Sequence, residues 1–219
     1  MRPLLQVALD MTDLRDAVQV AEAVGDEVDI LEAGTLLIAS AGMEAVRALK
    51  AVSGGRQVLA DLRIVRAGAA LTRLAVDAGA DVVVAMGAAP DAVLGAAVSE
   101  ATRAGAAVQV EPEADWTERD LRRWAELGID QVMHHRIVEA DEAGGPIDDT
   151  DRRLVEALAG SGMAVTVTGG LSRIDVETLV GWGVSAVAVG RAIAAAPGPG
   201  TAARGFRKAI ESGARPSPY

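Results

Sequence analysis

The sequence predicts a single (β/α)₈ barrel, the α/β fold in which eight parallel strands alternate with helices. Three observations support this prediction. Short runs rich in β-branched residues recur along the chain, an alanine-rich amphipathic stretch follows each of them, and 219 residues are enough for one sizeable core. Strand–helix alternation implies parallel strands with right-handed crossovers, and eight such units in about 200 residues favour a closed barrel.

The expected strands are short apolar runs, and glycine or polar residues commonly separate each preceding helix from the next run. They are Leu4–Leu9, Val28–Leu31, Gln57–Ala60, Val82–Ala85, Ala107–Val110, Gln131–His134, Ala164–Val167 and Ala186–Val189. Apolar residues at helical spacing predict helices such as Leu14–Val24 and Gly42–Val52. A doubly wound sheet is the alternative, but its glycine-rich turn after the first strand is replaced here by Asp10-Met11-Thr12-Asp13.

Residues 1–219 are expected to form one domain, because no low-complexity linker divides the chain. The segment Pro197-Gly198-Pro199-Gly200 separates the last strand unit from a final helix, roughly residues 201–212. Residues 213–219 are expected to be a frayed tail.

Composition excludes several classes of function. The net charge of −10 argues against nucleic acid and anionic membrane surfaces as partners, and the chain has no cysteine for disulfides, thiolate catalysis or metal binding. Only two of the 21 basic residues are lysines, both in helical stretches, which argues against Schiff-base chemistry. No secretory or membrane-spanning run is apparent, so a cytoplasmic location is expected.

Polar residues follow most of the predicted strands, at the end of the barrel where active sites lie. Acids and a histidine follow five of these strands: Asp10, Glu32, Asp61, Glu111 and His135. Only the fourth strand lacks a polar or glycine–arginine terminus of this kind. This ring of side chains is the strongest functional signal in the sequence.

Two glycine-containing turns follow the seventh and eighth strands and predict a phosphate site. Thr168-Gly169-Gly170 and Gly190-Arg191 would place backbone N–H groups and a guanidinium near an anion. The alternative is that these glycines only make tight turns, but their occurrence on adjacent strands favours anion binding.

Glu32 and Asp61 are expected to project from neighbouring strands into the same mouth, where two carboxylates suit Mg²⁺. The alternative is that these carboxylates pair with Arg63 or another arginine. His134 and His135 face opposite ways in an extended segment, and His135, nearer the strand end, is the better candidate for proton transfer.

Several segments resemble the orotidine 5'-monophosphate decarboxylase suprafamily, in the branch that contains 3-keto-L-gulonate 6-phosphate decarboxylase and hexulose-6-phosphate synthase. The similar segments are Leu5-Gln6-Val7-Ala8-Leu9-Asp10, residues 27–35, Trp116-Thr117, the region around His135-Arg136, and residues 165–171. The resemblance extends over essentially the whole chain.

The resemblance implies a homodimeric, Mg²⁺-dependent barrel that decarboxylates a β-keto sugar acid phosphate to a cis-enediolate, which is then protonated. The implied metal ligands are Glu32 and Asp61, and the implied proton donor is His135. Asp10 and Glu111 match the other acids of the site. The implied phosphate binders are Gly169, Gly170, Gly190 and Arg191, while Thr168 also favours the decarboxylase.

One motif departs from the family pattern D-x-K-x-x-D, since this chain has Asp61-Leu62-Arg63-Ile64-Val65-Arg66. Arg63 keeps the charge of the family lysine, so it can stabilise an enediolate electrostatically, but it cannot release a proton near neutral pH. Arg66 reverses the charge of an aspartate that the family offers across its dimer interface. The two arginines would repel each other unless an anion lies between them. Val138 stands where the decarboxylase branch has an arginine.

The sequence therefore predicts a carbon–carbon lyase acting on a phosphorylated keto sugar. A synthase-like aldolase acting on a ketose phosphate is one alternative. The other is a non-catalytic barrel that binds a phosphosugar, although such a protein would have no reason to retain Glu32, Asp61 and His135.

Overall fold

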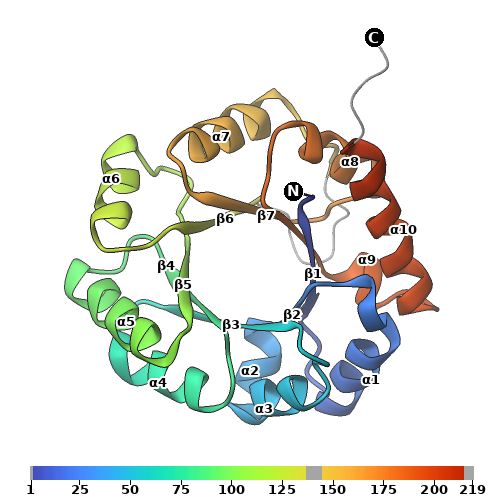
Figure 1. Cartoon of the computed structure of the whole chain (residues 1–219), viewed down its shortest axis with the longest axis horizontal. Coiled ribbons are helices and arrows are strands. Elements are labelled where there is room, and N and C mark those ends of the chain that lie inside the picture. Colours follow the sequence, from blue (N-terminus) through green and yellow to red (C-terminus); the bar gives the residue numbers. More distant parts are fainter. Residues whose placement is uncertain (1, 137–144, 215–219) are drawn as a thin grey trace.

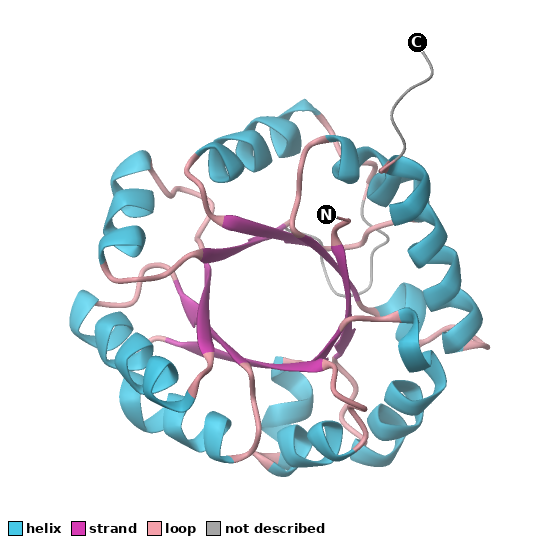
Figure 2. Cartoon of the chain, viewed as in Figure 1, coloured by secondary structure: helices cyan, strands magenta, loops and turns pink. Residues whose placement is uncertain are grey.

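The computed structural model describes residues 2–136 and 145–214, which form a closed barrel of eight parallel strands in chain order, β1 to β8 (Figure 1). The strands form the inner ring and the helices surround it (Figure 2). The predicted fold class is confirmed. Pairing of β1 with β8 closes the ring, so the first and last strands lie side by side.

The elements alternate along the chain as the sequence predicts. The strands are β1 (Leu4–Leu9), β2 (Ile30–Ala33), β3 (Gln57–Ile64), β4 (Val82–Met86), β5 (Ala107–Glu111), β6 (Gln131–His135), β7 (Ala164–Thr168) and β8 (Ala186–Val189). The helices are α1 (Leu14–Val24), α2 (Thr35–Ala41), α3 (Glu44–Ala51), α4 (Gly68–Asp77), α5 (Asp91–Ala104), α6 (Glu118–Glu126), α7 (Asp149–Gly160), α8 (Arg173–Gly181), α9 (Arg191–Ala194) and α10 (Pro199–Gly213), with a 3₁₀ turn at Gly25–Glu27.

Six of the eight expected strand ranges differ from the structure, four of them (β4, β5, β6 and β7) only by ending one residue later. Strand β2 begins two residues later than expected, because pairing with both neighbours starts at Ile30, and it also ends two residues later, so that it includes Glu32. Strand β3 continues through Asp61 to Ile64, and its register against β4 shifts between Ala60 and Ile64. An irregularity of this kind redirects side chains, and it occurs at the end of the barrel that carries the polar residues.

The predicted helix over residues 42–52 is also different in the structure. Helix α2 ends before Gly42, which has a φ of +62°, and α3 begins at Glu44. By contrast, α1 has the expected bounds, because the Asp13 side chain accepts hydrogen bonds from the backbone N–H groups of Arg15 and Asp16.

The core is aliphatic, as the low aromatic content predicts. Most buried apolar side chains pack between the strands and the surrounding helices, and a small second cluster lies inside the barrel. Its buried members are Ile30, Leu59, Val82, Val84 and Met133. Buried polar side chains, including Gln6, Gln109 and Thr166, share the strands with these residues, so the barrel interior becomes polar towards the site.

The C-terminal helix α10 reaches Gly213, and Ala214 follows it as a cap. Residues 215–219 of the expected frayed tail lie outside the described residues, as does Val138. None of the helices in the described ranges has the length and apolar character needed to span a membrane.

Candidate active site

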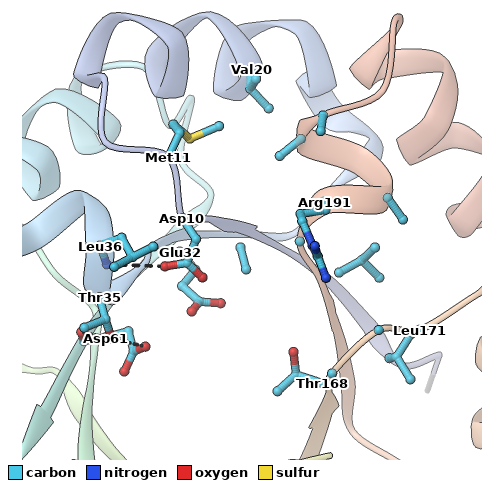
Figure 3. Close-up of a pocket in the computed structure, with 18 of the residues that line it drawn as sticks. Asp10, Met11, Val20, Glu32, Thr35, Leu36, Asp61, Thr168, Leu171 and Arg191 are labelled. Carbon is cyan, nitrogen blue, oxygen red and sulfur yellow. Dashed lines mark hydrogen bonds between the residues drawn. The ribbon is translucent and has the colours of Figure 1, made fainter. Parts of the chain in front are cut away.

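A cavity of about 1540 Å³ opens at the C-terminal ends of the strands. Figure 3 shows acids on one side of it and Thr168, Leu171 and Arg191 on the other. Its lining includes most of the predicted site residues: Asp10, Glu32, Asp61, Arg63, His135, Thr168, Gly169, Gly170, Gly190 and Arg191. Glu111 joins the site through contacts with Arg63 and His135.

Glu32 and Asp61 are the buried acids of the cavity, with 5% and 4% of their surface exposed. The Gln6 amide donates to Glu32 Oε2 over 2.6 Å, and the Thr35 hydroxyl donates to Asp61 Oδ2 over 2.7 Å. Asp61 Oδ1 is buried and has no hydrogen-bond partner among the described residues. The other oxygen of Asp61 is therefore held in place while Oδ1 retains its capacity to bind a cation or donor.

The electrostatic environment of these acids favours added positive charge. Burial, followed by repulsion from Asp61, raises the pKa of Glu32 to about 8, against the hydrogen bond from Gln6. Burial also raises the pKa of Asp61 above its ordinary value, against the hydrogen bond from Thr35 and the attraction of Arg63. The pair therefore takes up a proton or a cation more readily than exposed carboxylates do.

Arg63 joins two acids of the site. Its Nε lies 3.4 Å from Asp61 Oδ2, and its Nη2 lies 3.4 Å from Glu111 Oε2. The residue has a φ of +45°, in the left-handed region that few non-glycine residues adopt. The sequence analysis expects Arg63 and Arg66 to repel each other unless an anion lies between them. In the structure Arg63 contacts Asp61 and Glu111, and Arg66 is exposed.

The two histidines diverge as predicted. His135 Nδ1 lies 3.1 Å from Glu111 Oε1, and its ring lines the cavity. A carboxylate accepts hydrogen bonds, so Nδ1 carries the proton in this contact and Nε2 is the nitrogen left for exchange with a ligand. Arg63 Nη2 lies 3.4 Å from the same Nδ1, as a neighbouring charge. His134 instead approaches Asp151 on α7, with Nε2 3.5 Å from Oδ1.

The predicted phosphate turns lie on adjacent paired strands. Gly169 and Gly170 follow β7 with φ values of +103° and +62°, which side chains rarely tolerate. Gly190 precedes α9, and its carbonyl accepts hydrogen bonds from the N–H groups of Ile193 and Ala194. Arg191, the first residue of α9, projects into the cavity (Figure 3). This side of the cavity therefore offers backbone N–H groups and a guanidinium.

Asp10 directly follows β1 and lines the cavity, and its Oδ1 accepts a 3.4 Å hydrogen bond from the backbone N–H of Leu36. A side chain at Gly34 would place Cβ only 2.2 Å from that oxygen. Glycine at position 34 therefore lets the loop after β2 pass closely over Asp10.

The sequence prediction missed Gln6 and Thr35, which hold the two buried acids. Gln6 is a polar residue within an otherwise apolar strand, and Thr35 directly follows the glycine after β2. Both signals were visible in the sequence, but only the barrel register shows which acid each residue contacts.

Comparison with known proteins shows which family the chain belongs to. The Orotidine 5'-phosphate decarboxylase / HUMPS family model matches residues 3–206. The 3-keto-L-gulonate-6-phosphate decarboxylase of Salmonella typhi is 36% identical over 208 residues, covering 95% of this chain and 96% of the relative.

Solved structures agree. A crystal structure of KGPDC from Streptococcus mutans has a TM-score of 0.91 at 33% identity, covering 95% of this chain and 97% of that chain. The 3-hexulose-6-phosphate synthase from Salmonella typhimurium has a TM-score of 0.86 at 29% identity, covering 95% of this chain and 98% of that chain. The chain therefore belongs to the orotidine 5'-phosphate decarboxylase / HUMPS family.

Proposed function

We propose that the chain is a Mg²⁺-dependent carbon–carbon lyase that decarboxylates a β-keto sugar acid phosphate, with 3-keto-L-gulonate 6-phosphate as the first candidate substrate. The observation that most directly supports this proposal is that one cavity connects the Asp61–Arg63–Glu111–His135 cluster with the glycine turns after β7 and β8. The names of the similar proteins supply the substrate class.

The two buried acids fit a hard divalent cation. The Oδ1 atom of Asp61 is buried without a hydrogen-bond partner among the described residues, and burial together with repulsion from neighbouring acids raises the pKa of both Glu32 and Asp61. No cluster of three or more His, Asp or Glu side chains in the described ranges is arranged to hold a metal. Mg²⁺ binds through one or two carboxylates and completes its coordination with water or substrate oxygens. When bound by Glu32 and Asp61, Mg²⁺ would supply positive charge to substrate oxygens.

The remaining side chains have separable roles. Loss of CO₂ breaks the bond between the carboxylate carbon and the α-carbon, and the bonding electrons remain on the substrate as an enediolate. Arg63 stabilises that negative charge electrostatically, and Asp61 and Glu111 hold its guanidinium in position. In its imidazolium form, His135 then delivers the Nε2 proton to the carbon and becomes neutral, while its Nδ1–H remains bound to Glu111. Asp10, at the rim, binds substrate hydroxyl groups.

The phosphate of the substrate is proposed to bind at Gly169, Gly170, Gly190 and Arg191. Its distance from the acids would be set by the width of the cavity, with Thr168 on the phosphate side. The negative net charge of the chain makes such a local site necessary.

The test is ¹H NMR of the purified protein with Mg²⁺ and 3-keto-L-gulonate 6-phosphate in D₂O. We expect a pentulose phosphate with deuterium at the protonated carbon, and no turnover in EDTA. A protein that binds the substrate without turnover would contradict the decarboxylase assignment. The Arg63→Lys, Arg66→Asp double variant would then separate the remaining possibilities, since restored turnover indicates a site changed in its chemistry and continued inactivity indicates a binding protein.

An aldolase acting on a ketose phosphate is the second candidate, favoured by the similarity to 3-hexulose-6-phosphate synthase. Formaldehyde released from a hexulose 6-phosphate would distinguish it, because decarboxylation releases CO₂ instead. We further propose that the protein acts in the cytoplasm as a homodimer, with the interface near Arg66.

A further inference from the structure

Arg136 directly follows His135 and joins three segments around the predicted phosphate turn. Its side chain is 9% exposed. Nε lies 3.0 Å from Asp151 Oδ2, Nη1 donates to the Gly169 carbonyl over 3.2 Å, and Nη2 donates to the Gly145 carbonyl over 2.8 Å. The guanidinium therefore links the β7–α8 turn to the start of α7.

The backbone of Arg136 also supports the turn. Its N–H donates to the Thr168 carbonyl over 3.0 Å, which continues the pairing of β6 with β7 by one residue. A Cβ atom at Gly169 would lie 2.5 Å from the Arg136 carbonyl oxygen. Gly169 thus packs directly on Arg136, and no larger residue fits there.

The contact with the Gly169 carbonyl fixes the direction of the next N–H group. In a trans peptide the C=O and the following N–H point to opposite sides. Arg136 holds the Gly169 C=O, so the Gly170 N–H points away from Arg136, and Gly170 lines the cavity. Arg136, on the side of the peptide opposite the Gly170 N–H, therefore sets the orientation of an N–H group that could donate to an anion.

Hydrogen bonds from neighbouring residues hold both Arg136 and the turn after β7 in place. Asp151 Oδ2 also accepts the Asp148 N–H over 3.1 Å, so the acid that binds Arg136 is part of the α7 capping box. Asp175 makes a second link, because Oδ1 accepts the Ile147 N–H over 3.1 Å and Oδ2 accepts the Ser172 N–H over 2.8 Å. The turn is thus connected at both ends to residues 145–148.

We propose that Arg136 is a positioning residue that orients the Gly169–Gly170 peptide for the substrate phosphate. This inference deepens the proposed function, because it rests on the turn being the phosphate site. Arg136 acts through the backbone, and Arg191 is the arginine on the phosphate side whose side chain lines the cavity.

The test is a calorimetric titration with inorganic phosphate of the full chain and of two arginine variants, with a third variant, at Asp151, in support. Arg136→Lys keeps the charge but cannot reach all three partners with one ammonium. We expect its Kd for phosphate to rise about tenfold, since misplacing a binding group by a fraction of an ångström has effects of this order. The matched control is Arg207→Lys, because Arg207 is also 9% exposed and donates to the Glu27 carbonyl at the opposite end of the barrel.

Both variants are expected to lose stability, and only Arg136→Lys is expected to lose phosphate affinity. Asp151→Asn, which weakens the hold on Arg136 without removing it, should give a smaller rise in Kd and serves if Arg136→Lys does not fold. In the kinetic assay, KM should rise with kcat changed less than about twofold, since the reacting groups remain in place.

An unchanged phosphate Kd in the Arg136 and Asp151 variants, or an equal loss in Arg207→Lys, would overturn the inference. Phosphate binding by the parent chain without any turnover would instead contradict the proposed function alone. Failure of the parent chain to bind phosphate would overturn the inference together with the proposed phosphate site.

Discussion

At the scale of single residues, the site is governed by a shortage of positive charge. Glu32, Asp61 and Glu111 are all buried, and Arg63 contacts two of them. The sequence indicated that Arg63 replaces a family lysine, and a guanidinium suits the structural role because it can contact two carboxylates at once.

We therefore expect Arg63→Met to lower kcat about a hundredfold, the usual effect of removing a group that stabilises developing charge. Two buried acids would lose their compensating charge, and the enediolate would form beside them. Steady-state kinetics on the candidate substrate measures the change. Arg47→Met is the control, because Arg47 forms an exposed pair with Glu44 on α3. An Arg63→Met enzyme with parental kcat would contradict the electrostatic role.

His134 carries a prediction about pH. Burial lowers the pKa of His134 below its ordinary value of 6.5, against the contact with Asp151. The unfolded chain therefore binds a proton at this residue before the folded chain does. The free energy of unfolding should fall as pH drops below 6.5, with a slope approaching about 1.4 kcal/mol per pH unit, until the folded-state pKa is reached.

Chemical denaturation of the parent chain and His134→Gln between about pH 7.5 and pH 5 measures this slope. Taking the difference between the two proteins removes the common titration of the other acids and bases. The variant should lose less stability over this interval. Parallel curves would show that His134 does not contribute.

At the scale of elements, the sequence predicted which strands and helices exist better than it predicted where they begin and end. The alternation of runs identified all eight strands, because β-branched runs and helical spacing are local signals. The end of β3 could not be predicted, because the register shift after Ala60 depends on pairing with β4. The same limit applies to the site, since the acids and glycine turns were predictable from strand ends, whereas the contacts of Gln6, Thr35 and Arg136 depend on neighbouring strands.

The packing of α4 on α5 provides an element-scale prediction. A Cβ atom at Gly68, the first residue of α4, would lie 2.1 Å from the Val93 carbonyl oxygen. Gly68→Ala should therefore lower the free energy of unfolding by about 1–3 kcal/mol, the usual effect of overpacking. Gly95→Ala on α5 is the control, because its nearest neighbour lies 3.6 Å from the new Cβ.

Gly95→Ala should raise stability by about 0.5–1 kcal/mol, as alanine replaces glycine inside a helix. Urea denaturation of both variants measures the difference. Equal stability of the two variants would show that the α4–α5 contact relaxes without strain.

At the scale of the whole molecule, apolar side chains on the described surface bear on the proposed homodimer. Val65 is 51% exposed and adjoins Arg66, near which the interface is proposed. Ile174 is 76% exposed on α8. Exposed apolar groups of this size are common singly, and a shared interface would cover those near Arg66.

Light scattering should give twice the chain mass of 22.4 kDa. We expect Val65→Asp to lower that mass towards the monomer, because it would place a charge in an apolar contact. Ile174→Asp should leave it unchanged. A parental protein of 22.4 kDa would refute the dimer.

The pairing of β1 with β8 has a consequence for how the molecule resists unfolding. Asp10 from the first strand unit and Arg191 from the last both line the cavity, so a substrate bound as proposed would bridge the seam at which the ring closes. Separation of these two strands opens the ring and destroys the binding site in the same event. Ligand should accordingly slow amide hydrogen exchange along the whole of both seam strands, well beyond the residues that touch it. A substrate bound as proposed would therefore hold the first and last strand units together.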